Sequence, residues 1–188
     1  QAILDTVHGR DGIEVVAVAS DKPDAYALER ARAAGVPAAV FPIAPSADDR
    51  TARDQRIAAS LHERGAGLVV LAGYMQLLAP EFLRKFPDAV INVHPALLPA
   101  FPGLHAVEQA LAYGVKVFGV TVHFVDEGVD SGAVILQRAI DLPEARTPEE
   151  VMAALRPLEH ALLPEAVRLV AAGAARPDAA NPRRILLG

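Results

Sequence analysis

The chain has 188 residues, 52% of them hydrophobic, so it can bury one sizeable core but is too short for two ordinary domains. Its formal net charge is −5 with acidic and basic residues interspersed, which disfavours a binding track for DNA or RNA. It has no cysteine, which excludes disulfides and suits a reducing cytoplasm, and no apolar run approaches the roughly 20 residues of a membrane span.

The first half of the chain alternates helical stretches with apolar runs. After an opening helical stretch, the β-branched run at residues 13–19 predicts a buried strand. Residues 25–34 predict a helix that ends at a glycine, and residues 38–41 predict a short strand. Residues 48–64 are rich in alanine and charged residues, which is typical of a surface helix.

The second half continues this alternation. The short apolar runs at residues 68–72 and 90–93 predict two central strands, and further strands are expected at residues 119–125 and 134–140. A long helix is expected over residues 147–173, because its first residue is a threonine, a favoured N-cap, and a proline follows it.

Two prolines fall inside this last helix. Pro157 and Pro164 each remove a backbone donor and crowd the preceding turn, so we expect them to kink or split it. The tail that follows has loop composition until residues 184–187, which could add an edge strand. Together the elements predict an α/β fold, a doubly wound, mostly parallel (mixed) sheet with helices on both faces, and a single domain over residues 1–188.

Several familiar signatures are absent from the sequence. It has no Gly-x-Gly-x-x-Gly, no Walker-type loop, no His-Glu-x-x-His helix and no Gly-x-Ser-x-Gly elbow, which disfavours dehydrogenases, P-loop enzymes, zincins and serine hydrolases. The six histidines include no pair at the four-residue spacing of a helical metal site. We therefore expect no metal.

Two polar side chains stand at the end of an apolar strand. Asn92 and His94 lie two residues apart, so a strand would present them on one face, and the carboxyl end of that strand would direct them into a crevice. A histidine bonded to a backbone group beside the following prolines is an equally good interpretation. Asp130 lies in a loop between two glycines, where an aspartate is ordinarily a turn residue.

Taken together, these segments resemble the phosphoribosylglycinamide formyltransferase family, whose domain is formyltransferase-like and of Rossmann type. The similarity covers nearly all of the chain. The segments that carry it are residues 92–99, 101–106, 119–132, 71–75, 20–25 and 159–160.

The resemblance implies transfer of a formyl group from the co-substrate 10-formyltetrahydrofolate to the amine of glycinamide ribonucleotide, a step of purine synthesis. Asn92 would then donate a hydrogen bond to the oxyanion that develops, and His94 would supply a proton. Asp130 would lie near the imidazole and favour its charged form.

The resemblance also implies residues that bind the two substrates. Glu159 matches a glutamate that contacts the nucleotide. Gln76 stands where the family often has arginine, which weakens ionic help to the folate. The expected folate-binding residues are Arg50, Met75, Gln76, Leu77, Leu78, Asn92, Asp126, Glu127 and Gly128. Without the resemblance they would be ordinary core or surface residues.

Other readings remain open at this point. A formyl-folate hydrolase shares the Asn, His and Asp arrangement but usually has a second histidine where Pro95 stands. A methionyl-tRNA formyltransferase would carry a further domain, and a non-catalytic folate or nucleotide module would retain only the fold. The family's first strand and phosphate loop would precede Gln1, so we expect the natural protein to extend about 14 residues further upstream. A cytoplasmic location and a possible homodimer complete the expectations.

Overall fold

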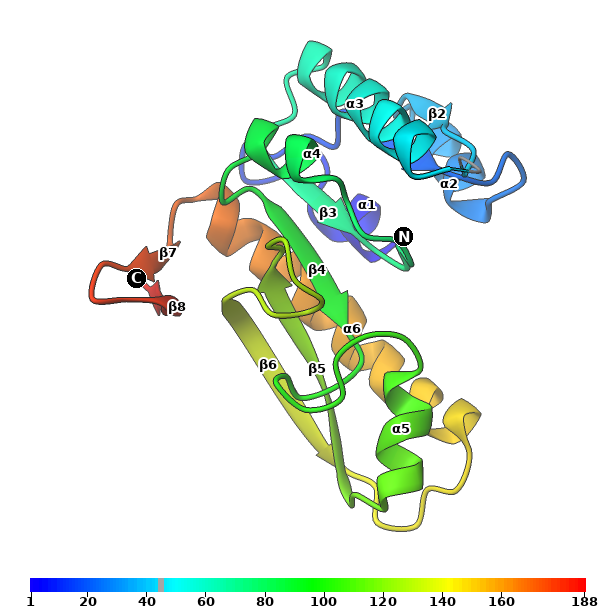
Figure 1. Cartoon of the computed structure of the whole chain (residues 1–188), viewed down its shortest axis with the longest axis vertical. Helices are drawn as coiled ribbons and strands as arrows, with labels where there is room; N and C mark the ends of the chain where they lie inside the picture. Colours follow the sequence, from blue (N-terminus) through cyan, green and yellow to red (C-terminus); the bar gives the residue numbers. More distant parts are fainter. Residues whose placement is uncertain (44–45) are drawn as a thin grey trace.

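The computed structural model describes residues 1–43 and 46–188 (Figure 1). Its helices are α1 (Ala2–Thr6), α2 (Tyr26–Ala33), α3 (Ala47–Glu63), α4 (Pro80–Lys85), α5 (Ala106–Tyr113) and α6 (Pro148–Ala171). Its strands are β1 (Val18–Ser20), β2 (Ala38–Val40), β3 (Val69–Leu71), β4 (Val90–His94), β5 (Val117–Phe124), β6 (Val134–Asp141), β7 (Ala175–Asp178) and β8 (Asn181–Leu187).

The described strands form two sheets. β1 and β2 pair in parallel by themselves, and the other six follow the order β3-β4-β5-β6-β8-β7. β3 and β4 are parallel, whereas the longer pairings of β4 with β5 and of β5 with β6 are antiparallel. The α/β class and the mixed sheet are confirmed, but parallel pairing does not dominate, because β5 and β6 are joined by a connection too short for a parallel crossover.

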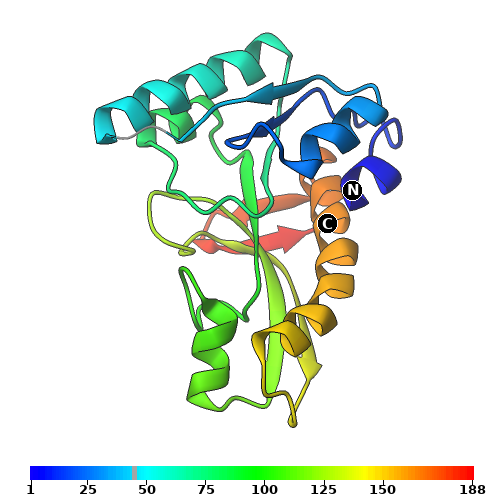
Figure 2. The same ribbon diagram turned by 90° about the vertical axis from the view of Figure 1, so that its right-hand side faces the viewer.

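Helices cover both faces of the sheet, as predicted. Val90 packs in one cluster with residues of α3 and α4, whereas its neighbour Ile91 packs in the other cluster with residues of α1 and α6. Successive side chains of a strand point to opposite faces, so the two clusters lie on the two sides of β4. Figure 2 shows α6 and α1 on one side and α3 and α4 on the other.

The helix α6 runs without a break through Pro157 and Pro164, so the predicted split is wrong. Its start is fixed by a capping box, in which Thr147 accepts from the Glu150 amide and the Glu150 carboxylate accepts from the Thr147 amide. Val151, like most of the inner face of α6, is buried in the main core. This burial holds the helix together despite the lost backbone hydrogen bonds.

Two further expectations about the elements are corrected, and three short elements were not predicted. The strand predicted at residues 13–19 is reduced to β1, since only residues 18–20 find a partner in β2. β3 is an edge strand of the larger sheet rather than a central one. The short helices α4 and α5 and the strand β7 were not predicted, because their sequences are too short to show a clear period.

A groove of about 690 Å³ separates β1 from β3. Residues 15–20 of the β1 segment line one side and residues 68–72 of the β3 segment the other, with α1 and the last turns of α6 also contributing. The edges of β1 and β3 that face this groove have no strand partner among the described residues. The two sheets are therefore separated at the place where a doubly wound sheet is normally continuous.

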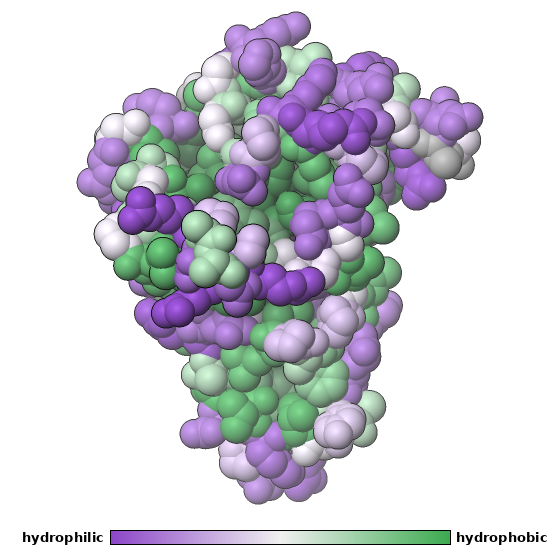
Figure 3. Space-filling model, turned by 60° about the vertical axis from the view of Figure 1, so that its left-hand side comes forward, coloured by the Kyte–Doolittle hydropathy of each residue, from purple (hydrophilic) through white to green (hydrophobic). Residues whose placement is uncertain are grey.

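Two further observations concern the hydrophobic residues of the molecule. Figure 3 shows hydrophobic residues reaching the surface in the narrow lower end of the molecule, where β5, β6 and α5 lie. Tyr113, at the end of α5, is 81% exposed. Among the described residues, no helix is both long and apolar enough to cross a membrane.

Candidate active site

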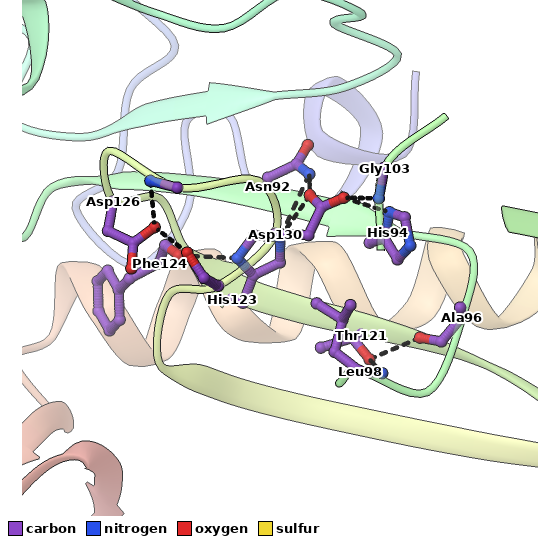
Figure 4. A network of polar contacts seen from close by, with 12 residues as sticks. Asn92, His94, Ala96, Leu98, Gly103, Thr121, His123, Phe124, Asp126 and Asp130 are labelled. Carbon is purple, nitrogen blue, oxygen red and sulfur yellow. Dashed lines mark hydrogen bonds and ion pairs between the residues drawn. The ribbon is translucent and has the colours of Figure 1, made fainter. Parts of the chain in front are cut away.

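The strand β4 presents Asn92 and His94 on one face of the sheet, as the alternation predicted. This face is opposite to Ile91, which packs toward α6, so the two polar side chains lie on the side of α3 and α4. Asp130 reaches the same place from the loop between β5 and β6, where its backbone has a positive φ of 49°. The predicted meeting of the three side chains is present in the structure (Figure 4).

Both ring nitrogens of His94 face hydrogen-bond acceptors. Nε2 lies 2.8 Å from the carbonyl oxygen of Phe101, which can only accept, and Nδ1 lies 3.3 Å from Oδ2 of Asp130. A proton on each nitrogen would satisfy both contacts. His94 is only 5% exposed, so these two contacts fix the orientation of its ring within the protein.

The Asp130 carboxylate is surrounded by donors. Oδ2 accepts from the amide of Gly103 at 2.7 Å, and Oδ1 lies 3.5 Å from both Asn92 Nδ2 and His123 Nε2. The contact with His123, then the Gly103 amide and the nearby His94, lower the pKa of Asp130 to about 2 against the opposing effect of burial. Asp130 is therefore ionised throughout the neutral range.

His123 is the site residue that sequence reasoning missed. It is the direct cross-strand partner of Asn92 in the β4–β5 pairing, so both side chains share a face. Its Nδ1 donates to the carbonyl of Phe124 at 2.7 Å, and its Nε2 lies 3.3 Å from Asn92 Nδ2. The alternation of Thr121 and His123 within an apolar strand was the available signal in the sequence. Only the register of β4 and β5 shows that His123 lies beside Asn92.

The turn that follows His94 is fastened by polar side chains of β5 and β6. The Thr121 hydroxyl donates to the Ala96 carbonyl at 2.7 Å and accepts from the Leu98 amide at 3.1 Å. Gln137 Nε2 donates to both Leu98 O and the Thr121 hydroxyl, at 2.8 and 2.9 Å. Residues 95–99 are thereby fixed relative to the strand that carries His123.

The next loop supplies the backbone groups that hold His94 and Asp130. Phe101, Gly103 and His105 all have positive φ values, of 53°, 83° and 61°. For Phe101 and His105 this conformation is unfavourable, and it persists because the surrounding contacts impose it. It turns the Phe101 carbonyl toward His94 and the Gly103 amide toward Asp130.

Asp126 stabilises the loop that carries Asp130 through two hydrogen bonds. Its Oδ1 accepts from the Ser131 hydroxyl at 2.6 Å and from the Gly128 amide at 3.0 Å. A Cβ at Gly132 would lie 1.8 Å from the Phe124 carbonyl oxygen, so only glycine fits where the loop returns to the sheet. The Asp126 side chain thus acts within the loop, whose residues 126–128 are exposed.

The other predicted folate residues occupy different environments. Met75 and Leu77 are 70% and 64% exposed on the segment between β3 and α4, whereas Leu78 packs against the cluster of α3 and α4. Arg50 lies exposed in the first turn of α3, and Glu127 is exposed on its loop. Among the described residues, no hydrogen bond or ion pair joins Arg50 to the catalytic side chains.

Two predicted residues do not point to the catalytic centre. Gln76 accepts a hydrogen bond from Arg53 at 2.8 Å. Glu159 lies half-buried on α6, which packs on the opposite face of the sheet from His94, and burial raises its pKa against the effect of His160 and Arg156. Within the described residues no ion pair joins Glu159 to the catalytic side chains, and no group of three or more histidine, cysteine or acidic residues could hold a metal ion.

A comparison with models of protein families shows which family the chain is related to. The model of the formyl transferase family matches residues 1–167. The chain belongs to this family. Within it, the most similar relatives include the phosphoribosylglycinamide formyltransferases of Bacillus subtilis, 43% identical over 79% of this chain and 75% of the relative, and of Haemophilus influenzae, 37% identical over 94% and 83%.

Solved structures of the formyl transferase family agree with this placement. The glycinamide ribonucleotide transformylase 1 of Symbiobacterium toebii superposes with a TM-score of 0.91 and 47% identity, over 99% of this chain and 86% of that chain. A formyltetrahydrofolate deformylase of Burkholderia mallei superposes with a TM-score of 0.80 and 32% identity, over 94% and 60%. The higher identity and the fuller coverage place the chain among the phosphoribosylglycinamide formyltransferases.

Proposed function

We propose that this chain transfers a formyl group from 10-formyltetrahydrofolate to the amine of glycinamide ribonucleotide, a step of purine synthesis, and that Asn92, His94 and Asp130 carry the chemistry. The observation behind the residue roles is the convergence of an amide, an imidazole and an ionised carboxylate on one face of the sheet. Membership of the phosphoribosylglycinamide formyltransferases supports the choice of acceptor.

The reaction requires no covalent intermediate with the enzyme. The amine nitrogen attacks the formyl carbon and forms a new C–N bond, and the carbonyl electrons move to the oxygen to give a tetrahedral oxyanion. As the oxyanion collapses, the bond between the formyl carbon and N10 of the folate breaks. The attacking nitrogen loses a proton and N10 gains one, so the products are the formylated amine and tetrahydrofolate.

Each proposed role follows from the geometry. Asn92 Nδ2 is an N–H donor on the open face of β4, where it can stabilise the oxyanion. The imidazolium of His94 can stabilise the same charge and protonate the leaving nitrogen. Asp130 holds the imidazolium through its carboxylate and orients it, which is the function of a carboxylate paired to a catalytic histidine.

The proposed folate site lies between two loops. Met75 and Leu77 offer exposed apolar side chains on one, and the exposed residues 126–128 offer backbone polar groups other than the engaged Gly128 amide on the other. A flat heteroaromatic ring with polar edges fits this combination. Arg50 and Glu159 are proposed contacts of the folate and of the nucleotide, respectively, and they rest on the family resemblance alone.

We further propose that an additional strand, which precedes Gln1 in the natural protein, fills the groove between β1 and β3. Both facing edges carry unpaired backbone groups that such a strand would satisfy, and the apolar side chains lining the groove would bury it. The loop after this strand would then emerge beside the carboxyl end of β3, one strand away from that of β4, where a nucleotide phosphate could bind. A homodimer and a cytoplasmic location stay predictions.

A formyl-transfer assay with glycinamide ribonucleotide tests the activity and the residue roles together. We expect His94→Ala and Asp130→Ala to lower turnover by roughly two or more orders of magnitude while leaving tetrahydrofolate binding nearly unchanged, because both act on the transition state. His62→Ala, an exposed histidine on α3, is the matched control and should be unaffected. Near-normal turnover in either catalytic variant would refute the assignment, and formate release without the amine would indicate a hydrolase instead.

A further inference from the structure

A buried ion pair on α3 has no part in the proposed reaction. The side chain of Arg53 is only 1% exposed, and its Nη2 lies 2.8 Å from Oδ1 of the adjacent Asp54, which is equally buried. Burial of charges is unfavourable unless their hydrogen-bonding groups find partners. The partners of this pair therefore indicate what it holds in place.

Among the described residues, the partners outside α3 all belong to the segment that connects β3 to α4. Arg53 donates through Nη2 to the Tyr74 hydroxyl and through Nη1 to Gln76 Oε1, both at 2.8 Å. Asp54 Oδ2 accepts from the amide of Ala79, the N-cap residue just before α4, at 2.9 Å. One ion pair thus fastens the connecting segment to α3 at three points.

The fastened residues alternate with exposed apolar ones. Tyr74 and Gln76 turn inward to Arg53, whereas Met75 and Leu77 between and beside them are 70% and 64% exposed. Large apolar side chains exposed on a connecting loop would ordinarily turn inward or move freely. Here the inward contacts of their neighbours leave them facing solvent.

We infer that Arg53 is a positioning residue for folate binding: through Gln76 and Tyr74 it holds segment 75–78 in the shape that presents Met75 and Leu77 to the pterin. The inference rests on the proposed folate site. Arg53 is too buried to touch the ligand, so it acts only through the segment. Gln76 is likewise engaged inward and does not replace, at the surface, the arginine that the family often has there.

The test compares Arg53→Lys, Gln76→Met and the double variant. Lysine keeps the charge beside Asp54 but lacks the guanidinium fork that reaches Tyr74 and Gln76 together, and methionine removes only the Gln76 contact. We expect KM for formyl-folate to rise about tenfold in each single variant, with kcat and KM for glycinamide ribonucleotide within about twofold of the unmodified chain. Because both changes break the same contact, the double variant should be little worse than the single ones.

Backbone hydrogen exchange of the ligand-free protein supplies a second measurement. Residues 74–79 should exchange faster in all three variants, and Arg56→Lys, an exposed arginine one turn along α3, should change neither exchange nor KM. The inference is overturned if exchange is unchanged, if the KM effects of the two single changes simply multiply, or if kcat falls while KM stays constant. Exchange is measured without substrate, so an inactive unmodified chain would refute the proposed function separately.

Discussion

Asp130 illustrates how a single carboxylate is fixed by what surrounds it. Its two oxygens face the Gly103 amide, the amide of Asn92 and two histidines, and these donors all favour the ionised form. An ionised Asp130 in turn places a hydrogen-bond acceptor 3.3 Å from Nδ1 of His94. The acid of the proposed mechanism is thus prepared before any substrate binds.

The lowered pKa of Asp130, about 2 instead of 3.8, predicts a pH-dependent stability. Because the folded-state pKa lies below the unfolded one, the stabilisation is present above about pH 4 and is lost as the pH falls toward 2. Asp130→Asn, which tolerates the same positive φ, should therefore lower the free energy of unfolding at pH 7 by about 1–2 kcal/mol, allowing for solvent screening. Urea unfolding at several pH values measures this.

The difference between the Asp130→Asn variant and the unmodified chain should shrink between pH 4 and pH 2. Asp141→Asn, at the exposed end of β6, is a control that should show no comparable difference. If the difference in free energy of unfolding stays constant or grows as the pH falls, the Asp130 carboxylate is not stabilised by its neighbours.

At the scale of elements, α6 is the part of the fold where local preference and tertiary packing disagree. Each internal proline removes a helical hydrogen bond, yet the helix continues for 24 residues. The ring of Pro157 is exposed, whereas that of Pro164 is buried among core residues. Pro157 therefore costs stability without contributing much packing, and Pro164 offsets part of its cost by burial.

Pro157→Ala is expected to stabilise the protein. It restores a backbone donor and removes the clash with the preceding turn, and the greater freedom of the unfolded chain offsets only part of this, so we expect a gain of about 1–2 kcal/mol. Pro148→Ala is the matched control, because Pro148 occupies the first helical turn, where no donor is needed, and its change should stay within about 0.5 kcal/mol. Urea unfolding would contradict the argument if Pro157→Ala lowered the midpoint.

For the whole molecule, the groove between β1 and β3 is the dominant feature. It separates a two-stranded sheet from a six-stranded one. Among the described residues, β1 and β3, which face the groove, each pair with another strand along one edge only. Backbone amide hydrogens on unpaired edges of this kind exchange readily with solvent, and such edges can pair with strands of other chains. The molecule as described should therefore be least protected at its centre.

A chain that includes the proposed additional strand should close this groove. We expect backbone amides of β1 and β3 to exchange at least tenfold more slowly in the extended chain than in the 188-residue chain, because an inserted strand would hydrogen-bond both edges. Amides in the β5–β6 pairing serve as the internal control and should change little. Equal exchange of β1 and β3 in the two chains would contradict the proposed strand.

Much of the site followed from local pattern. Asn92 and His94 lie two residues apart in an apolar run, so their common face depends only on the geometry of a strand. The glycines around Asp130 predicted a loop, and the structure shows why one of them is needed, since a side chain at Gly132 would collide with the Phe124 carbonyl. Most helix and strand positions were predicted for the same reason, because hydrophobic period and caps act over a few neighbouring residues.

What the sequence by itself determined is therefore the local part: the strand that carries Asn92 and His94, the start of α6 at Thr147, and the α/β alternation. Only the tertiary structure decided that His123 joins the site, that α6 continues through its prolines, and that residues 13–17 form no strand. Each of these depends on contacts distant in sequence, namely the register of β5 on β4, the core beneath α6, and the pairing of β1 with β2 alone among the described strands. Such contacts are long-range, and no short window of residues encodes them.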